Sequence, residues 1–406
     1  MTLFQELFCI FALILNHLLY FVTFTSVCRM NIYYRLCILI LLLSIGSDIY
    51  IWYQFLSGME QPLKWLHWLP TTVLIYSIII FIKDGYRNIP RKLTFAVVFI
   101  FLLSKLLFTL CSVAGFLFHQ PTWGNHIGIL FSLLIIISYI FGSTIGWRII
   151  RVKEITLYLP DLPPSFDGYT ISQLSDLHIG TYNKATNFIS KIVNKANALN
   201  ADSIVFTGDL INAHPSEVDN YVDILSNLKA RDGIISILGN HDYCYDVTDS
   251  APVRDTKLNL LIEREKELGW IVLLNSHYTI NRGNDSIDII GLEYNGDHDF
   301  PSRANLDQAL EGTHSKFKIM LCHNPIYWRK EILCKTDIQL TLSGHVHGSH
   351  IRIGKVAPMR LLHREWIGLY GNPSQKLYVC EGIGGLIPFR LGAWPEITHI
   401  TLKFKL

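Results

Sequence analysis

The sequence predicts a bundle of membrane-spanning helices followed by a soluble α/β domain with two packed sheets. Charged residues are scarce at the start: they make up 13 of the first 150 residues, against 55 of the remaining 256. The first part contains long apolar runs, whereas strand-like runs alternate with helix-like segments after residue 153. This division excludes a single water-soluble globule, a disordered protein and a small disulfide scaffold.

The first 150 residues contain five apolar runs, each close to the ~20 residues that a helix needs to cross a membrane. The runs cover approximately residues 3–24, 36–56, 63–82, 93–118 and 127–149. The first is followed too soon by others to be only a cleaved signal peptide, although it could be a signal anchor. We therefore expect a transmembrane domain of about five helices over residues 1–150 and a second domain over residues 154–406.

Basic residues in the short loops indicate how these helices are oriented. The loop over residues 83–92 and the segment after residue 147 are basic, whereas residues 119–126 contain no lysine or arginine. Because basic loops stay on the cytoplasmic side, the pattern predicts a multi-pass integral membrane protein with its N-terminus outside. The second domain is then cytoplasmic and lies beside the lipid bilayer.

Two charged residues, Asp48 and Lys105, fall inside apolar runs. A charge within a membrane costs about 2.5–3.5 kcal/mol on insertion scales, so it usually faces the bundle interior or a partner. One interpretation is that the two contact a polar ligand or form a gating pair. The other is that they pair with each other, or that Asp48 lies near the membrane interface.

Composition also bears on the remaining function classes. The net charge of +2 is too close to neutral to indicate a protein that binds nucleic acid. The eight cysteines include no Cys-x-x-Cys pair, so neither a zinc ribbon nor thioredoxin-like chemistry is supported.

The second domain reads as strands that alternate with helices and are buried on both sides. The predicted strands are residues 154–159, 169–174, 203–206, 233–238, 270–274, 287–292, 317–321 and 338–342. Helices are expected over residues 184–199, 217–228 and 256–268. The tail differs, because strand-like runs at 377–380 and 397–404 have no clear helix between them. Two packed sheets flanked by helices fit both parts.

Side chains that can bind metals follow five of these strands, at the point where each strand ends. In chain order they are Asp176 and His178, Asp209, Asn240 and His241, His323, and His345 and His347. Open α/β sheets build their binding sites at the carboxyl ends of the strands, so we expect these side chains to meet at one edge.

A single histidine after a strand is usually a locally satisfied polar group, and Gly-Asp is a common turn. The conjunction at five strand ends is different and predicts a metal site. Nitrogen and oxygen ligands without a thiolate suit Mn, Fe, Zn or Mg. Seven ligands are too many for one ion, but with a bridging carboxylate they serve two divalent ions.

The order of these blocks resembles the calcineurin-like metallophosphoesterase superfamily. Its pattern D-x-H, G-D-x-x-D, G-N-H-[DE], H and G-H-x-H is found at residues 176–178, 208–212, 239–242, 323 and 344–347. Within it, the segments 161–171 and 377–390 and the Pro-Glu-Ile at 395–397 are similar to the membrane-associated bacterial-type branch. The resemblance covers residues 154–406 and implies a four-layer α/β/β/α sandwich.

The resemblance also implies roles for the site residues. One metal would be held by Asp176, His178 and His347, and Asp209 would bridge to a second metal held by Asn240, His323 and His345. Two cations ~3.5–4 Å apart would polarise a phosphoryl group and activate a shared water. His241 would be the acid that protonates the leaving oxygen.

One position departs from the pattern: the last Asp of G-D-x-x-D is Asn212. In the superfamily this residue can orient the histidine that corresponds to His241, and a neutral amide cannot stabilise an imidazolium. An activated leaving group, such as a pyrophosphate, would tolerate the change. Arg352 and Arg390 are candidates for clamping a phosphate, the alternative being ordinary surface arginines.

The membrane spans favour a lipid-linked phosphoester or pyrophosphate as substrate, reached close to the headgroup plane. Trp366, Leu369 and Phe389 belong to an apolar set that could form its entrance, or could instead be core packing. A soluble phosphodiester hydrolysed by an anchored enzyme is the plainer alternative. A second class of function is a membrane sensor or transporter-like protein whose phosphoesterase domain binds phosphate without turnover.

Overall fold

The computed structural model describes residues 32–60, 62–84, 91–182, 185–244, 249–296, 301–354 and 356–404. The chain divides into two compact units, Met1–Ile140 and Phe141–Leu406. The second unit therefore includes the last residues of the long helix α7 (Pro121–Thr144). The domain limits predicted from the sequence, 150 and 154, stay a prediction.

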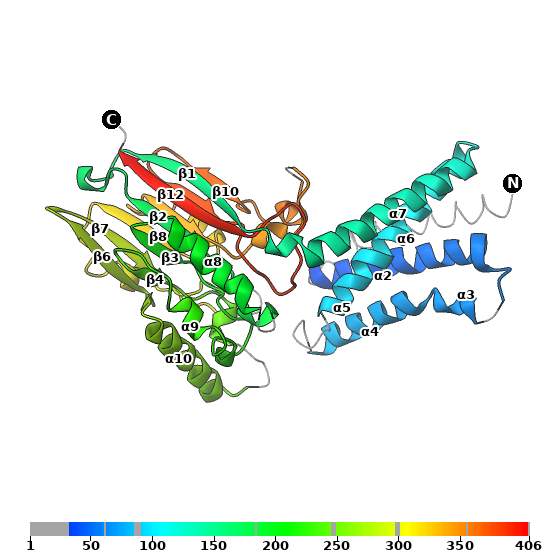
Figure 1. Ribbon diagram of the computed structural model, residues 1–406, viewed down its shortest axis with the longest axis horizontal. Coiled ribbons are helices and arrows are strands. Elements are labelled where there is room, and N and C mark those ends of the chain that lie inside the picture. The colour runs from blue at the N-terminus through cyan, green and yellow to red at the C-terminus, as the bar shows by residue number, and fades with distance from the viewer. Residues whose placement is uncertain are drawn as a thin grey trace. The chain divides into compact units, whose positions relative to one another are not determined.

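The first unit is helical throughout its described part (Figure 1). Its elements are α2 (Ile32–Ile51) with a π-helical end (Trp52–Leu56), α3 (Leu63–Leu66), α4 (Leu69–Asp84), α5 (Arg91–Ala96), a π-helical turn (Val97–Leu102), α6 (Leu103–Leu117) and most of α7. Most residues in the long helices are apolar, so exposing these helices to water would carry a large free-energy cost.

Three helical stretches among the described residues are long and apolar enough to cross a membrane: Cys37–Leu56, Lys92–Leu117 and Pro121–Arg148. They match the second, fourth and fifth predicted runs. The first run lies outside the described residues. The third falls on α3 and α4, and α4 has 16 residues, fewer than a full span needs.

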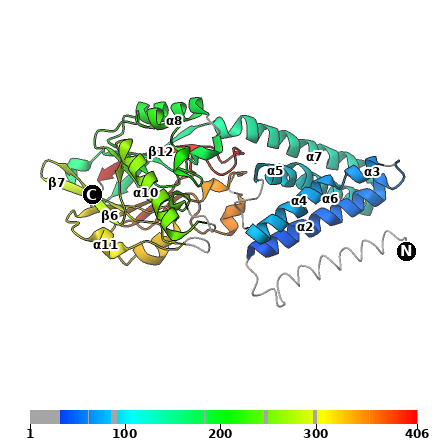
Figure 2. The ribbon, with the colours of Figure 1, turned by 90° about the horizontal axis from the view of Figure 1, so that it is seen from below.

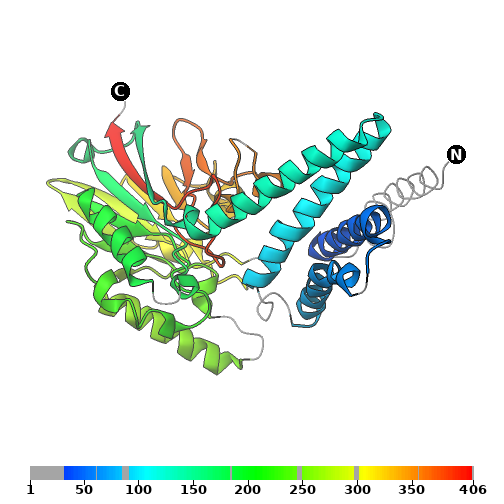
Figure 3. The same cartoon turned by 45° about the vertical axis from the view of Figure 1, so that its right-hand side comes forward.

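Helices α6 and α7 form a hairpin, visible as the two long helices in Figure 3. Ser132 Oγ donates a hydrogen bond to the Ser104 carbonyl at 3.1 Å, and Ser104 Oγ donates to the Ser132 carbonyl at 3.4 Å. Such small polar residues allow two apolar helices to approach closely and give the contact direction.

The second unit contains two six-stranded sheets. The first has the order β1 (Arg151–Leu159), β12 (Glu396–Phe404), β2 (Thr170–Leu174), β3 (Ser203–Phe206), β4 (Ile234–Ser236) and β5 (Ile271–Val272). Strands β2 to β5 are parallel, β12 runs antiparallel to β2, and β1 is parallel to β12.

The second sheet has the order β10 (Gly368–Gly371), β11 (Lys376–Val379), β9 (Leu340–Ser343), β8 (Phe317–Leu321), β7 (Asp285–Gly291) and β6 (Ser276–Arg282). Its four central strands are parallel, while β10 and β6 run antiparallel at the two edges.

The sheets pack face to face, because the inner side chains of both form one buried core that includes Ile171, Val205, Ile289 and Ile319. A second core lies between the first sheet and α8 (Thr186–Ala198), α9 (Val222–Leu225) and α10 (Ala251–Glu267). A third lies under α11 (Leu306–Leu310) on the other sheet. In Figure 2, α8 and α11 lie on opposite sides of the sheets. The expected four-layer sandwich is thus confirmed.

Helix α8 shows why the local sequence folds this way. Phe188, Ile189, Ile192, Val193 and Ala196 recur at helical spacing and are all buried against the first sheet. This apolar stripe gives α8 its position, since an amphipathic helix gains most of its stability from the face that it buries.

Two details of the predicted elements were wrong. The helix expected over residues 217–228 is a 3₁₀ turn (Pro215–Glu217) and the four-residue α9. Strands β6 and β10 were not predicted. Both are edge strands whose residues are mostly exposed or partly exposed, so they lack the continuous apolar run that identifies a buried strand.

Candidate metal centre

The candidate centre is formed by the five loops that follow β2, β3, β4, β8 and β9. Hydrogen bonds tie the loops together, such as the Asp176 N–H to the Gly208 carbonyl at 2.9 Å and the Gly344 N–H to the His323 carbonyl at 3.1 Å. All eight side chains predicted from the sequence lie in these loops and are buried or partly buried: Asp176, His178, Asp209, Asn240, His241, His323, His345 and His347.

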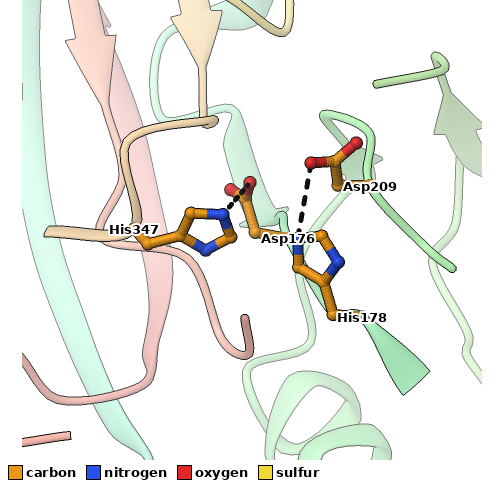
Figure 4. Close-up of side chains that lie close together, drawn as sticks. All are labelled: Asp176, His178, Asp209 and His347. Atoms are coloured by element: carbon orange, nitrogen blue, oxygen red, sulfur yellow. Dashed lines mark ion pairs between the residues drawn. The ribbon is translucent and has the colours of Figure 1, made fainter. Parts of the chain in front are cut away.

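A first group brings Asp176, His178, Asp209 and His347 together, with one potential ligand atom of each within 4.8 Å of the others. Figure 4 shows the two pairs facing each other. His178 Nε2 lies 3.4 Å from Asp209 Oδ2, and His347 Nε2 lies 3.6 Å from Asp176 Oδ1.

A second group shares Asp209 and adds His323 and His345. His323 Nε2 lies 3.3 Å from Asp209 Oδ2 and 3.2 Å from His345 Nδ1. Asn240 Oδ1 lies 3.1 Å from the same His345 nitrogen. The two groups together contain six of the seven ligands expected from the sequence, with Asp209 common to both, and the seventh, Asn240, lies against His345 of the second group.

The residues fit a metal site, as the hydrogen bonds of the imidazoles indicate. His178 Nδ1 is 3.1 Å from Asn212 Oδ1, and His323 Nδ1 is 2.7 Å from the Thr207 carbonyl. Because a carbonyl only accepts, each Nδ1 carries the proton and each Nε2 offers a lone pair to the cluster. His178 Nε2 is buried without a hydrogen-bond partner. Neighbouring ligands of one ion with bonds of ~2.1 Å lie about 3 Å apart, close to the spacings observed.

The pKa shifts of the cluster residues are also those expected at a cation-binding site. Burial opposes ionisation of Asp209, but the facing His323 and His241 outweigh it and hold its pKa well below the usual range. Burial lowers the pKa of His345 to about 3, with further lowering from His323. Burial also lowers the pKa of His241 to about 4. Burial opposes protonation of His323, but the facing Asp209 outweighs it and raises the pKa of this imidazole to about 9. The charge of Asp209 is thus balanced by a proton on His323, which a bound divalent cation would displace.

The backbone of the ligand loops is strained. Positive φ angles occur at Asp176 (54°), His178 (48°), Asp209 (60°), His345 (75°) and His347 (53°). The left-handed conformation costs roughly 1–2 kcal/mol for a residue with a Cβ. Strain of this kind persists only where the surroundings impose it, and it is concentrated at functional sites.

Asp242 is one residue that imposes this conformation, and sequence reasoning gave it no role. Its carboxylate accepts hydrogen bonds from the backbone N–H groups of Asp209 (2.7 Å), Leu210 (2.9 Å), Ile211 (3.1 Å) and Gly239 (2.9 Å). It therefore joins the loop of Asp209 to the loop of Asn240. The one feature of the sequence that could have indicated a role for Asp242 is its position in the G-N-H-D block.

Close approach explains two of the glycines in the pattern. A Cβ at Gly239 would overlap Asp209 Oδ1, and a Cβ at Gly344 would overlap Ser175 Oγ and Asp176 Oδ2. Any side chain at either position would displace a proposed ligand, so these glycines are needed for packing as well as for the turn.

From the sequence, we expected the side chain at position 212 to lie beside His241, and this expectation was wrong. The Asn212 side chain lies against His178 and Thr181, whereas its backbone carbonyl is 2.8 Å from His241 Nδ1. His241 therefore donates to a main-chain oxygen that is present whatever residue occupies position 212. The amide instead orients His178, so replacing it would affect a proposed metal ligand and not the proposed proton donor.

The interpretation of Arg352 and Arg390 as phosphate clamps is not supported by their contacts. Arg390 is almost fully buried and donates hydrogen bonds to the carbonyls of His347 at 2.6 Å, Glu381 at 3.0 Å and Gly384. Arg352 forms an ion pair with Glu381 at 2.7 Å. Arg390 thus organises the loops around His347, a role that a sequence pattern cannot distinguish from a surface arginine.

The predicted apolar entrance is divided. Trp366 and Phe389 are buried, as in core packing, whereas Leu369 is about half exposed at 52%. These residues do not form one apolar surface.

Residues 169–349 match the family model described as calcineurin-like phosphoesterase. YkuE of Bacillus subtilis, a metallophosphoesterase by name, is 30% identical over 66% of this chain and 90% of its own length. The chain belongs to the calcineurin-like metallophosphoesterase family. Members of this family are hydrolases that act on phosphoesters, and the Asp and His cluster described above is where a metal can be bound.

Two further relatives carry informative names. A transmembrane protein with metallophosphoesterase domain from Danio rerio is 30% identical over 62% of this chain and 57% of its own length, so the chain spans little more than half of that relative. UDP-2,3-diacylglucosamine pyrophosphatase LpxG of Chlamydia muridarum is 26% identical over 64% of this chain and 92% of its own length.

Proposed function

We propose that this metallophosphoesterase is a membrane-bound, dinuclear enzyme that hydrolyses a phosphoester or pyrophosphate bond in a lipid-linked substrate. The observation that carries the proposal is the pair of overlapping ligand groups that share the buried carboxylate of Asp209. A single ion would not use seven ligands, whereas two ions bridged by one carboxylate would.

In this proposal, Asp176, His178 and His347 hold one divalent ion, Asn240, His323 and His345 hold the other, and Asp209 contacts both. Mn, Fe, Zn and Mg all accept such ligands. When bound, two such ions polarise a phosphoryl group and lower the pKa of water. The Nδ1 protons of His178 and His323, donated to Asn212 and Thr207, keep both rings in the tautomer that offers Nε2.

His241 is the proposed proton donor to the leaving oxygen. Its backbone N–H donates to Asp209 Oδ1 at 2.9 Å and its Nδ1 donates to the Asn212 carbonyl at 2.8 Å, which fixes the ring beside the ligands. Because burial lowers the pKa of His241 to about 4, the ring has to gain a proton at Nε2 before it can act in this role. This assignment needs no carboxylate at position 212.

The membrane part of the proposal rests on different observations. Three helical stretches are long enough to span a bilayer, and the zebrafish relative is named as a transmembrane protein. The Chlamydia relative is named for a pyrophosphatase activity on a diacylated sugar nucleotide. Together with the basic loops, these features support a multi-pass protein with a cytoplasmic phosphoesterase unit close to its lipid-linked substrate.

The test uses the full chain in a neutral detergent. Metal content is measured first, followed by hydrolysis of a chromogenic phosphodiester, a chromogenic monoester and a diacylated pyrophosphate-linked lipid, with Mn added. We expect two metal ions per chain and the fastest turnover on the lipid substrate. Bound metal without hydrolysis of any of the three substrates would contradict the enzymatic proposal and favour a phosphate sensor.

A further inference from the structure

An exposed aliphatic segment follows the loop of His347. Four side chains within ten residues, which we call the aliphatic quartet, are largely exposed: Ile353 (76%), Val356 (74%), Leu361 (89%) and Leu362 (52%). They lie in the orange part of the chain in Figure 1. Scattered single apolar residues are normal on a protein surface, but such a group marks a contact with an apolar partner.

The charges exposed beside the quartet are basic. Arg360 and Arg364 are exposed, whereas the nearby acid, Glu365, is buried and pairs with Arg329 and, at 4.0 Å, with Arg364. Aliphatic side chains interleaved with arginines are typical of segments that lie in the interface of an anionic membrane. A protein partner would not require this combination.

The quartet lies on the part of the second unit that meets the end of α7. Ile351, two residues before the quartet, forms bridges to Leu391 and Gly392. The adjacent Arg390 N–H donates to the Gly142 carbonyl at 3.2 Å. A Cβ at Gly142 would overlap the ring of Phe389. Gly142 lies near the end of the candidate span Pro121–Arg148, so these contacts put the start of the segment close to the point where that span ends.

A cationic hollow lies at the same end of α7. It has a volume of about 520 Å³ and is lined by Arg148, Lys191 and Lys195 together with apolar residues of the segment 144–150. No acidic residue lines it, and none of the three cations forms an ion pair with a described residue. The guanidinium of Arg148 donates to the Thr144 carbonyl and lies 4.2 Å from the Trp147 ring centroid. The hollow thus offers positive charge that no carboxylate among the described residues balances, where the span ends.

We propose that these two features form one membrane-contact surface: the aliphatic quartet inserts between the headgroups of an anionic bilayer, and Arg148, Lys191 and Lys195 bind the phosphates of those lipids. The inference rests on the proposed membrane placement of α7. Each lysine near an anionic surface strengthens binding roughly fivefold. Since the segment starts a few residues after the proposed ligand His347, the metal centre would open beside the lipid surface.

The first test locates the quartet. The full chain is reconstituted into phosphatidylcholine vesicles with about 30% phosphatidylglycerol and a phosphatidylcholine that carries a photoreactive group in its acyl chain. After illumination, labelled peptides are mapped by mass spectrometry. We expect label in the peptide that contains Leu361 and Leu362, as well as in the predicted spans. Label in the spans alone would overturn this inference and leave the proposed function standing, whereas label in neither would overturn the membrane placement too.

Matched variants test the side chains. Leu361→Ser with Leu362→Ser is expected to reduce labelling of that peptide at least fivefold. The control, Val253→Ser with Leu260→Ser, changes two exposed aliphatic residues of α10 and should leave it unchanged. Equal labelling in both variants would show that the quartet does not enter the bilayer.

The cationic hollow is tested with the full chain in neutral detergent by counting bound phosphatidylglycerol in native mass spectra. Lys191→Gln with Lys195→Gln should weaken retention by roughly 25-fold, because each lysine contributes about fivefold. Lys266→Gln with Lys316→Gln, two exposed lysines elsewhere, should not change it. Equal retention in both variants, or displacement of the lipid by millimolar inorganic phosphate, would overturn a lipid headgroup as the ligand.

Discussion

Each unit contains a buried aspartate in a polar cluster, and the two clusters are built differently. In the first unit, Asp48 is fully buried, accepts a hydrogen bond from Thr71 and pairs with Lys105 at 2.5 Å. Lys105 also donates to the His67 carbonyl at 2.9 Å. In the second unit, Asp209 faces imidazole nitrogens from three sides and no lysine or arginine.

The difference shows what each cluster requires. The charge of Asp48 is balanced within the protein, so this cluster is complete and the interpretation of Asp48 and Lys105 as partners of each other is confirmed. The cluster around Asp209 places one carboxylate against imidazole nitrogens at 3.3–3.4 Å, with no lysine or arginine to balance it. Its charge is balanced by a proton on an imidazole, or by a cation that takes the place of this proton. The first cluster is therefore complete in itself, whereas the second can exchange a proton for a metal ion.

The largest expected effect is on the cluster around Asp209. Asp209→Asn removes the anion that both ligand groups share, so we expect loss of at least one bound metal and a ~10³-fold or greater fall in hydrolysis of a chromogenic phosphodiester. Metal analysis and steady-state kinetics measure this. Asp255→Asn, an exposed carboxylate of α10, is the control. Metal loss with activity unchanged would contradict the site.

A substitution in the cluster around Asp48 should lower the stability of the protein and leave its metal content unchanged. Lys105→Met leaves Asp48 buried and unpaired, which costs about 3–5 kcal/mol. We expect the apparent Tm of the full chain in detergent to fall by roughly 10 °C. The double variant Asp48→Asn with Lys105→Met should recover most of this loss, because no charge is then left unpaired. A double variant as unstable as the single one would show that the pair is not the cause.

Asn212 distinguishes ligand orientation from proton donation. Because its side chain contacts His178, Asn212→Ala should weaken metal binding about 10–100-fold. The ratio of turnover for activated and unactivated leaving groups should not change, since the carbonyl that holds His241 remains. Asn194→Ala, an exposed residue of α8, serves as the matched variant. A changed ratio of turnover with unchanged metal affinity would show that the Asn212 side chain acts through His241 and not through His178.

Glu265 is also a buried carboxyl, but it neither pairs with a lysine, as Asp48 does, nor belongs to the candidate metal centre, as Asp209 does. Burial raises its pKa to about 8, and Ser236 donates the hydrogen bond that it accepts at 2.6 Å. The folded state thus holds a proton that the unfolded state loses above about pH 4.3, so stability falls as pH rises from there towards 8. Glu265→Gln should remove this dependence and raise the apparent Tm at pH 8 by about 3–5 °C, with a smaller gain at pH 6. An equal shift at both pH values would argue against a titrating carboxyl.

Much of the fold could be read from local patterns. Strands β3 and β8 begin and end at the predicted residues, because both are short apolar runs that are buried on two sides. The exposed edge strands β6 and β10 gave no such signal. The segment 217–228 has the periodicity of a helix, yet tertiary contacts use most of it as turns. The spacing of apolar residues thus predicts which side chains are buried. Whether the segment between two strands forms a helix or turns depends on tertiary contacts that the local sequence does not show.

The site shows the same limit at the level of single contacts. The eight side chains could be named because each belongs to a short block at the end of a strand. Which group lies beside each of them could not, since His241 and His323 are held by the carbonyls of Asn212 and Thr207. Every residue has a carbonyl, so the sequence does not indicate which one a loop presents.

The fit between the end of α7 and the sheets has a practical consequence for anyone preparing a water-soluble fragment. Gly142 and Gly146 lie directly against Phe389 and Arg390, and Trp147 stacks on Tyr182 at 5.1 Å. Truncation at β1 would uncover an aromatic ring and remove a hydrogen-bond acceptor of the Arg390 backbone, next to the guanidinium that holds the loop of His347. Expression should therefore begin no later than Phe141, so that an inactive fragment is not mistaken for an inactive enzyme.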